Sequence, residues 1–205
     1  MLQSLFDSGL LFTEFLERAK TNAALWRDTY RLTRSSPDAV ARLAGVPGRW
    51  HLLVMLEDWC GDGVNIVPVL ARLAELAPNV DLRVIGRDEH AELMDTHLTC
   101  GARSIPIVIV LDEDFVERGW WGPRPRALQE LAMGEWATLP KDERYRSIRT
   151  WYARDRGRTT VAEILETIEH AAMLRAVPSG GPDGDHLPVR RDWDCERWAR
   201  VVAQR

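Results

Sequence analysis

Cysteine is scarce in this chain, which carries three such residues among 205, at positions 60, 100 and 195. An odd number of cysteines at wide spacing does not predict a framework of structural disulfides. We therefore expect no framework of structural disulfides, and we take a reducing cytoplasm as the setting in which the protein works.

Long apolar runs and an excess of basic charge are also missing. No stretch reaches the roughly 18 uninterrupted apolar residues of a membrane span, and the N-terminal segment lacks the basic start of a secretory signal. The net charge of −4 gives no electrostatic reason to bind nucleic acid or an anionic membrane. We expect neither of these partners, and we expect a cytoplasmic location.

What is present is an alternation of strand and helix patterns, which predicts an α/β protein. The spacing of apolar residues predicts helices within 1–45, over about 60–76 and within 124–175. Strands are expected at 50–56, 80–86, 107–114 and 115–122. A helix separates the first two strands, so we expect these two to pair in parallel.

We expect a single domain over residues 1–175. Its apolar helices need a partner surface, and the α/β core is the large one available, so we expect the added helices to pack on the sheet as one layer. The later segment PSGGPDGDHLPVRRD is rich in Gly, Pro and charge, which is typical of a flexible tail, and WDCERWARVVAQR behind it is either a docking helix or a disordered end. The expected parts are a core at 48–138, helical additions at 1–45 and 125–175, and a flexible tail at 176–205.

Cys60 lies in the segment EDWCGDGVNI, directly after an apolar strand and at the start of a predicted helix. A helix N-terminus presents free N–H groups and partial positive charge, which favour the thiolate, the nucleophile of disulfide exchange. The carboxylates of Glu57, Asp58 and Asp62 act in the opposite direction. We expect the helix end to prevail and to hold the pKa of Cys60 below the free value of about 8.5. The residues alone fit a small buried hydrophobic side chain equally well.

The surroundings of this cysteine favour a reactive thiol over a small buried hydrophobic side chain. Trp59 precedes Cys60, Gly61 follows it, and Pro68 lies eight residues beyond it. The motifs RDE, ARSIP and WGPRP follow farther along the chain. Together with DWCGD, these features resemble the thioredoxin superfamily over roughly residues 48–138, and within it a bacterial branch of thioredoxin-like proteins with added helices.

The resemblance implies a thioredoxin-like fold, in which helices flank a central mixed sheet of about four strands, with extra N- and C-terminal helices. It also implies that Pro106 of the RSIP motif is in cis and faces Cys60. Ser104, Ile105 and Pro106 would then hold the backbone of a substrate. Arg103 is a candidate for supporting the thiolate with positive charge; otherwise it is a surface arginine.

Gly63 departs from this pattern, because two-cysteine thioredoxins carry their second thiol at that position. Cys60 can then attack a disulfide but has no neighbouring thiol to release the bound partner. We therefore predict a monothiol thiol–disulfide oxidoreductase that acts on protein or low-molecular-weight disulfides and thiols. Cys60 is its catalytic residue, in a motif with Trp59, Gly61, Asp62 and Gly63. The alternative is a redox-inert module that retains the thioredoxin fold for protein recognition.

Two cysteines outside the motif are candidates for a resolving thiol, although an unpaired cysteine is the simpler interpretation of each. Cys100 precedes Pro106 by six residues, and Cys195 lies on the tail. His97 and Cys100 are three residues apart, but third and fourth ligands are missing, so we expect no metal. Asp62–Gly63 also does not match the motif of one-cysteine glutaredoxins that share an iron–sulfur cluster. We expect no cofactor.

Overall fold

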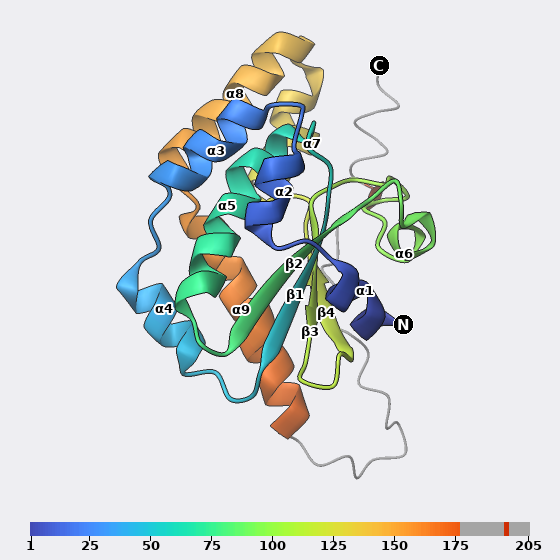
Figure 1. Cartoon of the computed structure of the whole chain (residues 1–205). Helices are drawn as coiled ribbons and strands as arrows, with labels where there is room; N and C mark the ends of the chain where they lie inside the picture. The colour runs from blue at the N-terminus through green and yellow to red at the C-terminus, as the bar shows by residue number, and fades with distance from the viewer. Residues whose placement is uncertain (177–194, 197–205) are drawn as a thin grey trace.

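The computed structural model describes residues 1–176 and 195–196, and a four-stranded sheet lies at its centre (Figure 1). The strand order is β2-β1-β3-β4; β1 and β2 are parallel, and β3 runs antiparallel to both β1 and β4. The predicted mixed α/β sheet is therefore confirmed. The strands are β1 (Trp50–Leu56), β2 (Val80–Gly86), β3 (Ile107–Leu111) and β4 (Glu117–Trp121).

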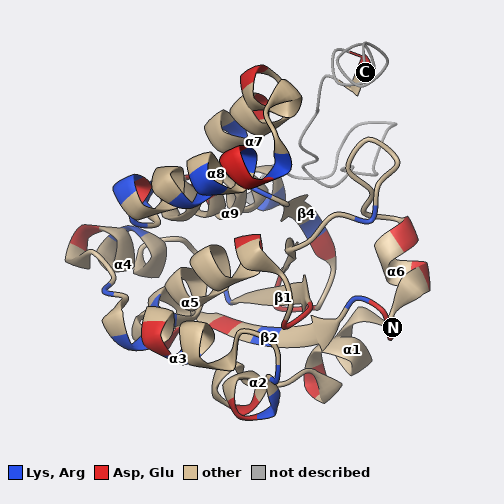
Figure 2. Ribbon diagram, turned by 90° about the horizontal axis from the view of Figure 1, so that it is seen from above, with Lys and Arg blue, Asp and Glu red and all other residues tan. Residues whose placement is uncertain are grey.

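Four helices cover one face of the sheet, beginning with the long helix that follows β1 (Figures 1 and 2). Every residue of β1 is buried, as expected for a strand with an apolar run and neighbours on both sides. Trp26, wholly buried, fills the space between α3 and the start of α5. The four helices are α3 (Ala23–Leu32), α4 (Pro37–Ala44), α5 (Gly61–Leu76) and α9 (Arg158–Ala176).

The opposite face carries α1 (Leu2–Ser8) and the short α6 (Ala91–Asp95) (Figure 2). Phe6 of α1 packs edge-on against the ring of His51 from β1, with the two centroids 4.8 Å apart. The added helices therefore do not form one layer, and that prediction was wrong. The error has a physical cause, since an amphipathic pattern shows that a helix buries a face but does not say which side of a sheet receives it.

The segment before α2 (Phe12–Arg18) covers the free edge of β2. Leu10 forms an isolated antiparallel bridge with Val84, and each donates its N–H to the carbonyl of the other, at 2.8 and 2.9 Å. This bridge satisfies backbone groups that an exposed edge would leave unpaired. None of the helices in the described part of the chain is long and apolar enough to cross a membrane.

The chain after β4 forms α7 (Arg126–Met133), a short 3-10 helix at Glu135–Thr138, and α8 (Lys141–Asp155), before it returns across the sheet as α9. One cluster of buried apolar side chains extends from Phe6 to Ala171. The single domain over 1–175 stays a prediction. The predicted tail at 176–205 lies outside the described residues, apart from residue 176 and the pair at 195–196.

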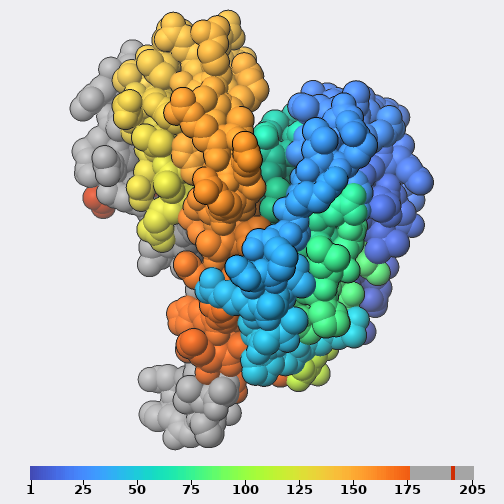
Figure 3. All heavy atoms as spheres, turned by 90° about the vertical axis from the view of Figure 1, so that its left-hand side faces the viewer, coloured from blue at the N-terminus to red at the C-terminus, as the bar shows by residue number. Residues whose placement is uncertain are grey.

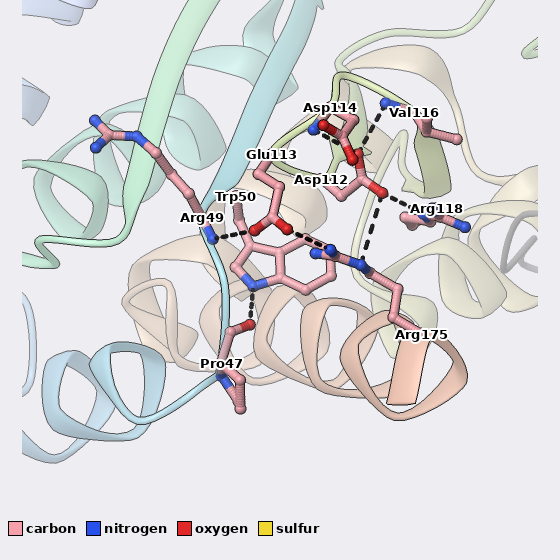
Figure 4. A network of polar contacts seen from close by, with 9 residues as sticks. All are labelled: Pro47, Arg49, Trp50, Asp112, Glu113, Asp114, Val116, Arg118 and Arg175. Carbon is pink, nitrogen blue, oxygen red and sulfur yellow. Dashed lines mark hydrogen bonds and ion pairs between the residues drawn. The ribbon is translucent and has the colours of Figure 1, made fainter. Parts of the chain in front are cut away.

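A buried carboxylate connects the turn after β3 to the last turn of α9 (Figure 4). Asp112 has no exposed surface, and it accepts hydrogen bonds from the Asp114 and Val116 N–H groups, both at 3.0 Å, and from Arg118 Nε at 2.6 Å. Arg175 Nε lies 3.8 Å away. Burial alone would raise the pKa of Asp112, but these donors hold it below its ordinary value.

We predict that Asp112→Asn lowers the free energy of unfolding by about 3 kcal/mol, because it removes the buried charge that two arginines and two backbone N–H groups surround. Urea or thermal unfolding measures the loss. Glu113→Gln is the control, since it breaks an exposed ion pair with Arg175 of the same network and should change stability far less. Equal losses in the two variants would contradict this account of Asp112.

Candidate functional site

Cys60 is the N-cap residue of α5 and lies between the helix and the loop before β3. Its Sγ accepts a hydrogen bond from the Gly63 N–H at 3.3 Å, and its S–H donates to the Ile105 carbonyl at 3.4 Å. The Ile105–Pro106 peptide is cis, as predicted. The sequence therefore located the thiol and the loop that faces it, and only 5% of the cysteine is exposed.

The pKa of this thiol is raised, not lowered. Burial is the largest cause and the negative charge of Asp62 is the second, and together they raise the pKa of Cys60 to about 11. The pKa is lowered, but by less, by the N–H groups of Gly63 and Asp62 and by the charge of Arg124. The predicted depression was wrong because the sequence indicated the helix end but not the depth at which the sulfur is buried.

A partly buried ion pair beside Cys60 was not predicted from the sequence. Arg124, in the loop after β4, binds Asp62 through two parallel hydrogen bonds of 2.9 and 2.6 Å. Tyr152 of α8 donates its hydroxyl to the same carboxylate at 2.9 Å. The nearby carboxylate raises the pKa of Arg124, and burial raises that of Tyr152. The WGPRP motif contained the signal for Arg124, whereas nothing in the sequence pattern pointed to Tyr152.

Arg103, the predicted support for the thiolate, has another partner. Its Nε and Nη2 bind the Asp95 carboxylate at 2.7 and 2.6 Å. Arg124 is instead the arginine whose charge lowers the pKa of Cys60. The ion pair with Asp95 favours the alternative interpretation of Arg103 as a surface arginine; neighbours in sequence, here the ARSIP motif, do not show which way a side chain turns.

Gly63 lies where no side chain fits without displacing the core. A Cβ atom at this position would clash with Cδ1 of Leu56 and lie 3.1 Å from Cη2 of Trp26. Both residues are at most 1% exposed. Trp26 is held in place by a 2.8 Å hydrogen bond from its indole N–H to the Asp58 carbonyl. The place of a second cysteine is therefore filled by packing, and we do not expect that a cysteine placed there would suffice to give turnover.

A second cis peptide joins Gly122 to Pro123, next to the first one. Gly122 has a φ of +139°, and a Cβ atom there would clash with the carbonyl oxygen of Pro106. The WGPRP loop thus packs directly on the loop that faces Cys60, and only glycine permits the approach. This contact places Arg124 beside the start of α5.

Cys100 and Cys195 form a disulfide with a Cα–Cα distance of 5.2 Å. The simpler interpretation, that each of these cysteines is unpaired, was therefore wrong, because spacing could not show that a residue 95 positions away returns to the same place. Cys60 is the free cysteine. While they are bonded to each other, the two proposed resolving residues carry no free thiol, and Cys100 has none to offer a metal with His97.

The cysteine opens into a cavity of about 670 Å³. Ser104 and Ile105 line this cavity, together with Lys141, Tyr145 and Arg149 of α8. In Figure 3 the molecule is hollowed between the orange side that contains α8 and the blue side that contains α3. Within the described residues, no three His, Cys, Asp or Glu side chains lie close enough to hold a metal ion.

The exposed members of the motif lie at the mouth of this cavity. Trp59 is 48% exposed, and the guanidinium of Arg87 lies 4.9 Å from the centre of its ring. Gly61 has no atom within 4 Å of the place where a Cβ would stand. The surface around Cys60 is thus open toward Trp59 and Gly61 and closed toward Gly63.

We predict that Asp62→Asn speeds alkylation of Cys60 at pH 7 by about tenfold, because it removes the negative charge nearest the thiolate and leaves the positive charge of Arg124. The rate of reaction with iodoacetamide, followed from pH 6 to 11, measures the effect. Asp58→Asn is the control, since that carboxylate binds the Lys20 and Thr21 N–H groups. An unchanged rate profile in Asp62→Asn would contradict the electrostatic role given to Asp62.

Comparison with known proteins supports the fold described above. A crystal structure of a protein of unknown function from Pseudomonas aeruginosa is similar, with a TM-score of 0.67, 24% identity, and coverage of 82% of this chain and 97% of that one. An HIV epitope-scaffold gives a TM-score of 0.64 and 22% identity, over 85% of this chain and 98% of that one. Among the curated proteins, none matches.

A family model described as thioredoxin matches residues 9–145, which is more than half of the chain. The matched region contains the whole sheet, Cys60, the cis-proline loop and Arg124. The chain therefore belongs to the thioredoxin family.

Proposed function

We propose that this protein is a monothiol thiol–disulfide oxidoreductase whose nucleophile is Cys60. The observation that carries the proposal is the position of the sulfur. It lies at the N-terminus of α5, accepts an N–H from that helix, faces the loop of Ser104, Ile105 and Pro106, and forms part of the wall of a cavity. A purely structural cysteine needs neither a cavity nor a facing loop.

The Ile105 carbonyl is the proposed contact for a substrate backbone. In the free protein it accepts the S–H of Cys60, so the bond is lost when the thiol gives up its proton. An N–H of an extended substrate can then donate to the vacated carbonyl. Ser104, beside it in the cavity wall, would contact the same substrate.

The exchange proceeds in two steps. The Cys60 thiolate attacks one sulfur of a disulfide, the S–Cys60 bond forms as the substrate S–S bond breaks, and the leaving thiolate takes up a proton. An external thiolate then attacks the sulfur of the bound partner, which reforms the Cys60 thiol and leaves the partner in a new disulfide. Because Gly63 supplies no second thiol, the intermediate persists until that external thiol arrives.

The raised pKa makes the first step slow at neutral pH, since few of the molecules carry a thiolate. The thiolates that do form are strong nucleophiles, because nucleophilicity rises with pKa. The same pKa of about 11 favours the second candidate function, a redox-inert module for protein recognition. The two candidates differ in whether Cys60 ever forms a disulfide.

We predict that mild treatment with a low-molecular-weight disulfide gives a stable adduct on Cys60, and that reduction of insulin-type disulfides is weak or absent. Peptide mass spectrometry without reductant detects the adduct. Cys60→Ser serves as the control and should remain unmodified, because the remaining two cysteines are bonded to each other. A wild-type protein that forms no adduct even at pH 9 would support the redox-inert module.

We predict that Gly63→Cys lowers the free energy of unfolding by roughly 1–3 kcal/mol, the usual cost of overpacking, and gives little gain in turnover. Adding Leu56→Ala removes the nearer of the two side chains that a Cβ at 63 would meet, and this double variant should turn over faster than Gly63→Cys. Leu56→Ala alone controls for the loss of packing. Full turnover in stable Gly63→Cys would show that the steric account is wrong.

A further inference from the structure

We infer that the cavity beside Cys60 selects an anionic, carboxylate-bearing low-molecular-weight disulfide or thiol. The inference rests on the function proposed above and names the substrate class for the same site.

The wall of the cavity carries far more positive than negative charge. It contains five basic side chains and one carboxylate, that of Asp62, although the chain as a whole has a net charge of −4. A cleft with one sign of charge concentrates ligands of the opposite sign and speeds their arrival. The basic side chains are Arg87, Arg103, Arg124, Lys141 and Arg149.

Two of these cations have no carboxylate partner in the described part of the chain. Arg124 binds Asp62, and Arg103 and Arg87 have their own ion pairs outside the wall. Lys141 and Arg149 have no carboxylate within ion-pair distance among residues 1–176 and 195–196. They are thus the charges available to a ligand.

The two available cations lie on one side of α8. Lys141, Tyr145 and Arg149 are four residues apart, so they form a single row along the helix. Tyr152, on the same helix, is anchored to Asp62 next to Cys60. The row therefore lines the same cavity as Cys60, where it can meet carboxylates while a ligand sulfur reaches the thiol. Figure 2 shows blue segments of Lys and Arg along α8.

The size of the space points to a small molecule. A volume of about 670 Å³ falls within the range of roughly 300–1,000 Å³ that is typical of small-ligand sites. A single inorganic anion would fill little of it. A short peptide thiol with two carboxylates, such as glutathione, matches both the volume and the charge.

The test compares three small disulfides at low ionic strength: oxidised glutathione, which is anionic, cystamine, which is cationic, and hydroxyethyl disulfide, which is neutral. We expect the anionic disulfide to modify Cys60 at least about tenfold faster than the cationic one. Lys141→Gln/Arg149→Gln should remove most of this preference. Arg144→Gln/Arg146→Gln is the matched control, because it removes the same charge from α8 outside the cavity wall. Equal rates for the anionic and cationic disulfides would overturn the inference.

A binding measurement separates this inference from the proposed function. S-methylglutathione keeps the carboxylates but cannot form a disulfide, and calorimetry can follow its binding to the wild-type protein and both double variants. Binding that requires Lys141 and Arg149 supports the cavity even where no disulfide reacts, in which case only the redox proposal fails. No binding of this thioether, or equal binding to all three proteins, would overturn the inference.

Discussion

The ion pair between Asp62 and Arg124 is the constraint on which the site depends. It joins the first turn of α5 to the loop after β4, and the Tyr152 hydroxyl adds α8 to the same carboxylate. Taking two charges out of water is costly, and the two parallel hydrogen bonds together with the tyrosine offset that cost. Loss of either partner would leave a partly buried charge unpaired, and loss of Asp62 would also remove the hydrogen bond that ties Tyr152 of α8 to this site. The pair thus shapes both the wall of the cavity and the electrostatics of Cys60.

The added N-terminal helices also shape the site around Cys60. Trp26 of α3 and Leu56 of β1 occupy the space next to Gly63, so the position of a second thiol has become part of the core. The difference from two-cysteine thioredoxins therefore extends beyond position 63 to the packing around it. This packing leaves no room for a side chain at Gly63, which favours a site with a single thiol.

The sequence was informative where the signal was local. The apolar run at 50–56 predicted a buried strand, the residues around Cys60 predicted a helix N-terminus, and the RSIP motif predicted a cis Pro106. Tertiary placement could not be predicted in this way. Tyr152 is 90 residues from Asp62, and the two cysteines of the disulfide are 95 residues apart.

The predicted direction of the pKa shift at Cys60 was wrong for a related reason. A helix end can be predicted from a few neighbouring residues, but burial depends on everything that packs around the sulfur. Here the loss of water around the thiol outweighs the helix N–H groups, and the carboxylate of Asp62 adds to the effect. The sequence indicated the helix N-terminus, which lowers the pKa of Cys60, but not the burial, which raises it by more.

The central claim is that Cys60 attacks a disulfide once and has no internal thiol to complete the cycle. The most direct measurement is the amount of chromophore released from a dithiobis-nitrobenzoate reagent by native protein whose Cys100–Cys195 disulfide is intact. The account predicts slow release of one equivalent per chain, with the second nitrobenzoate thiol held on Cys60 until an external thiol is added. Release of two equivalents without added thiol, or of none at high pH, would contradict it.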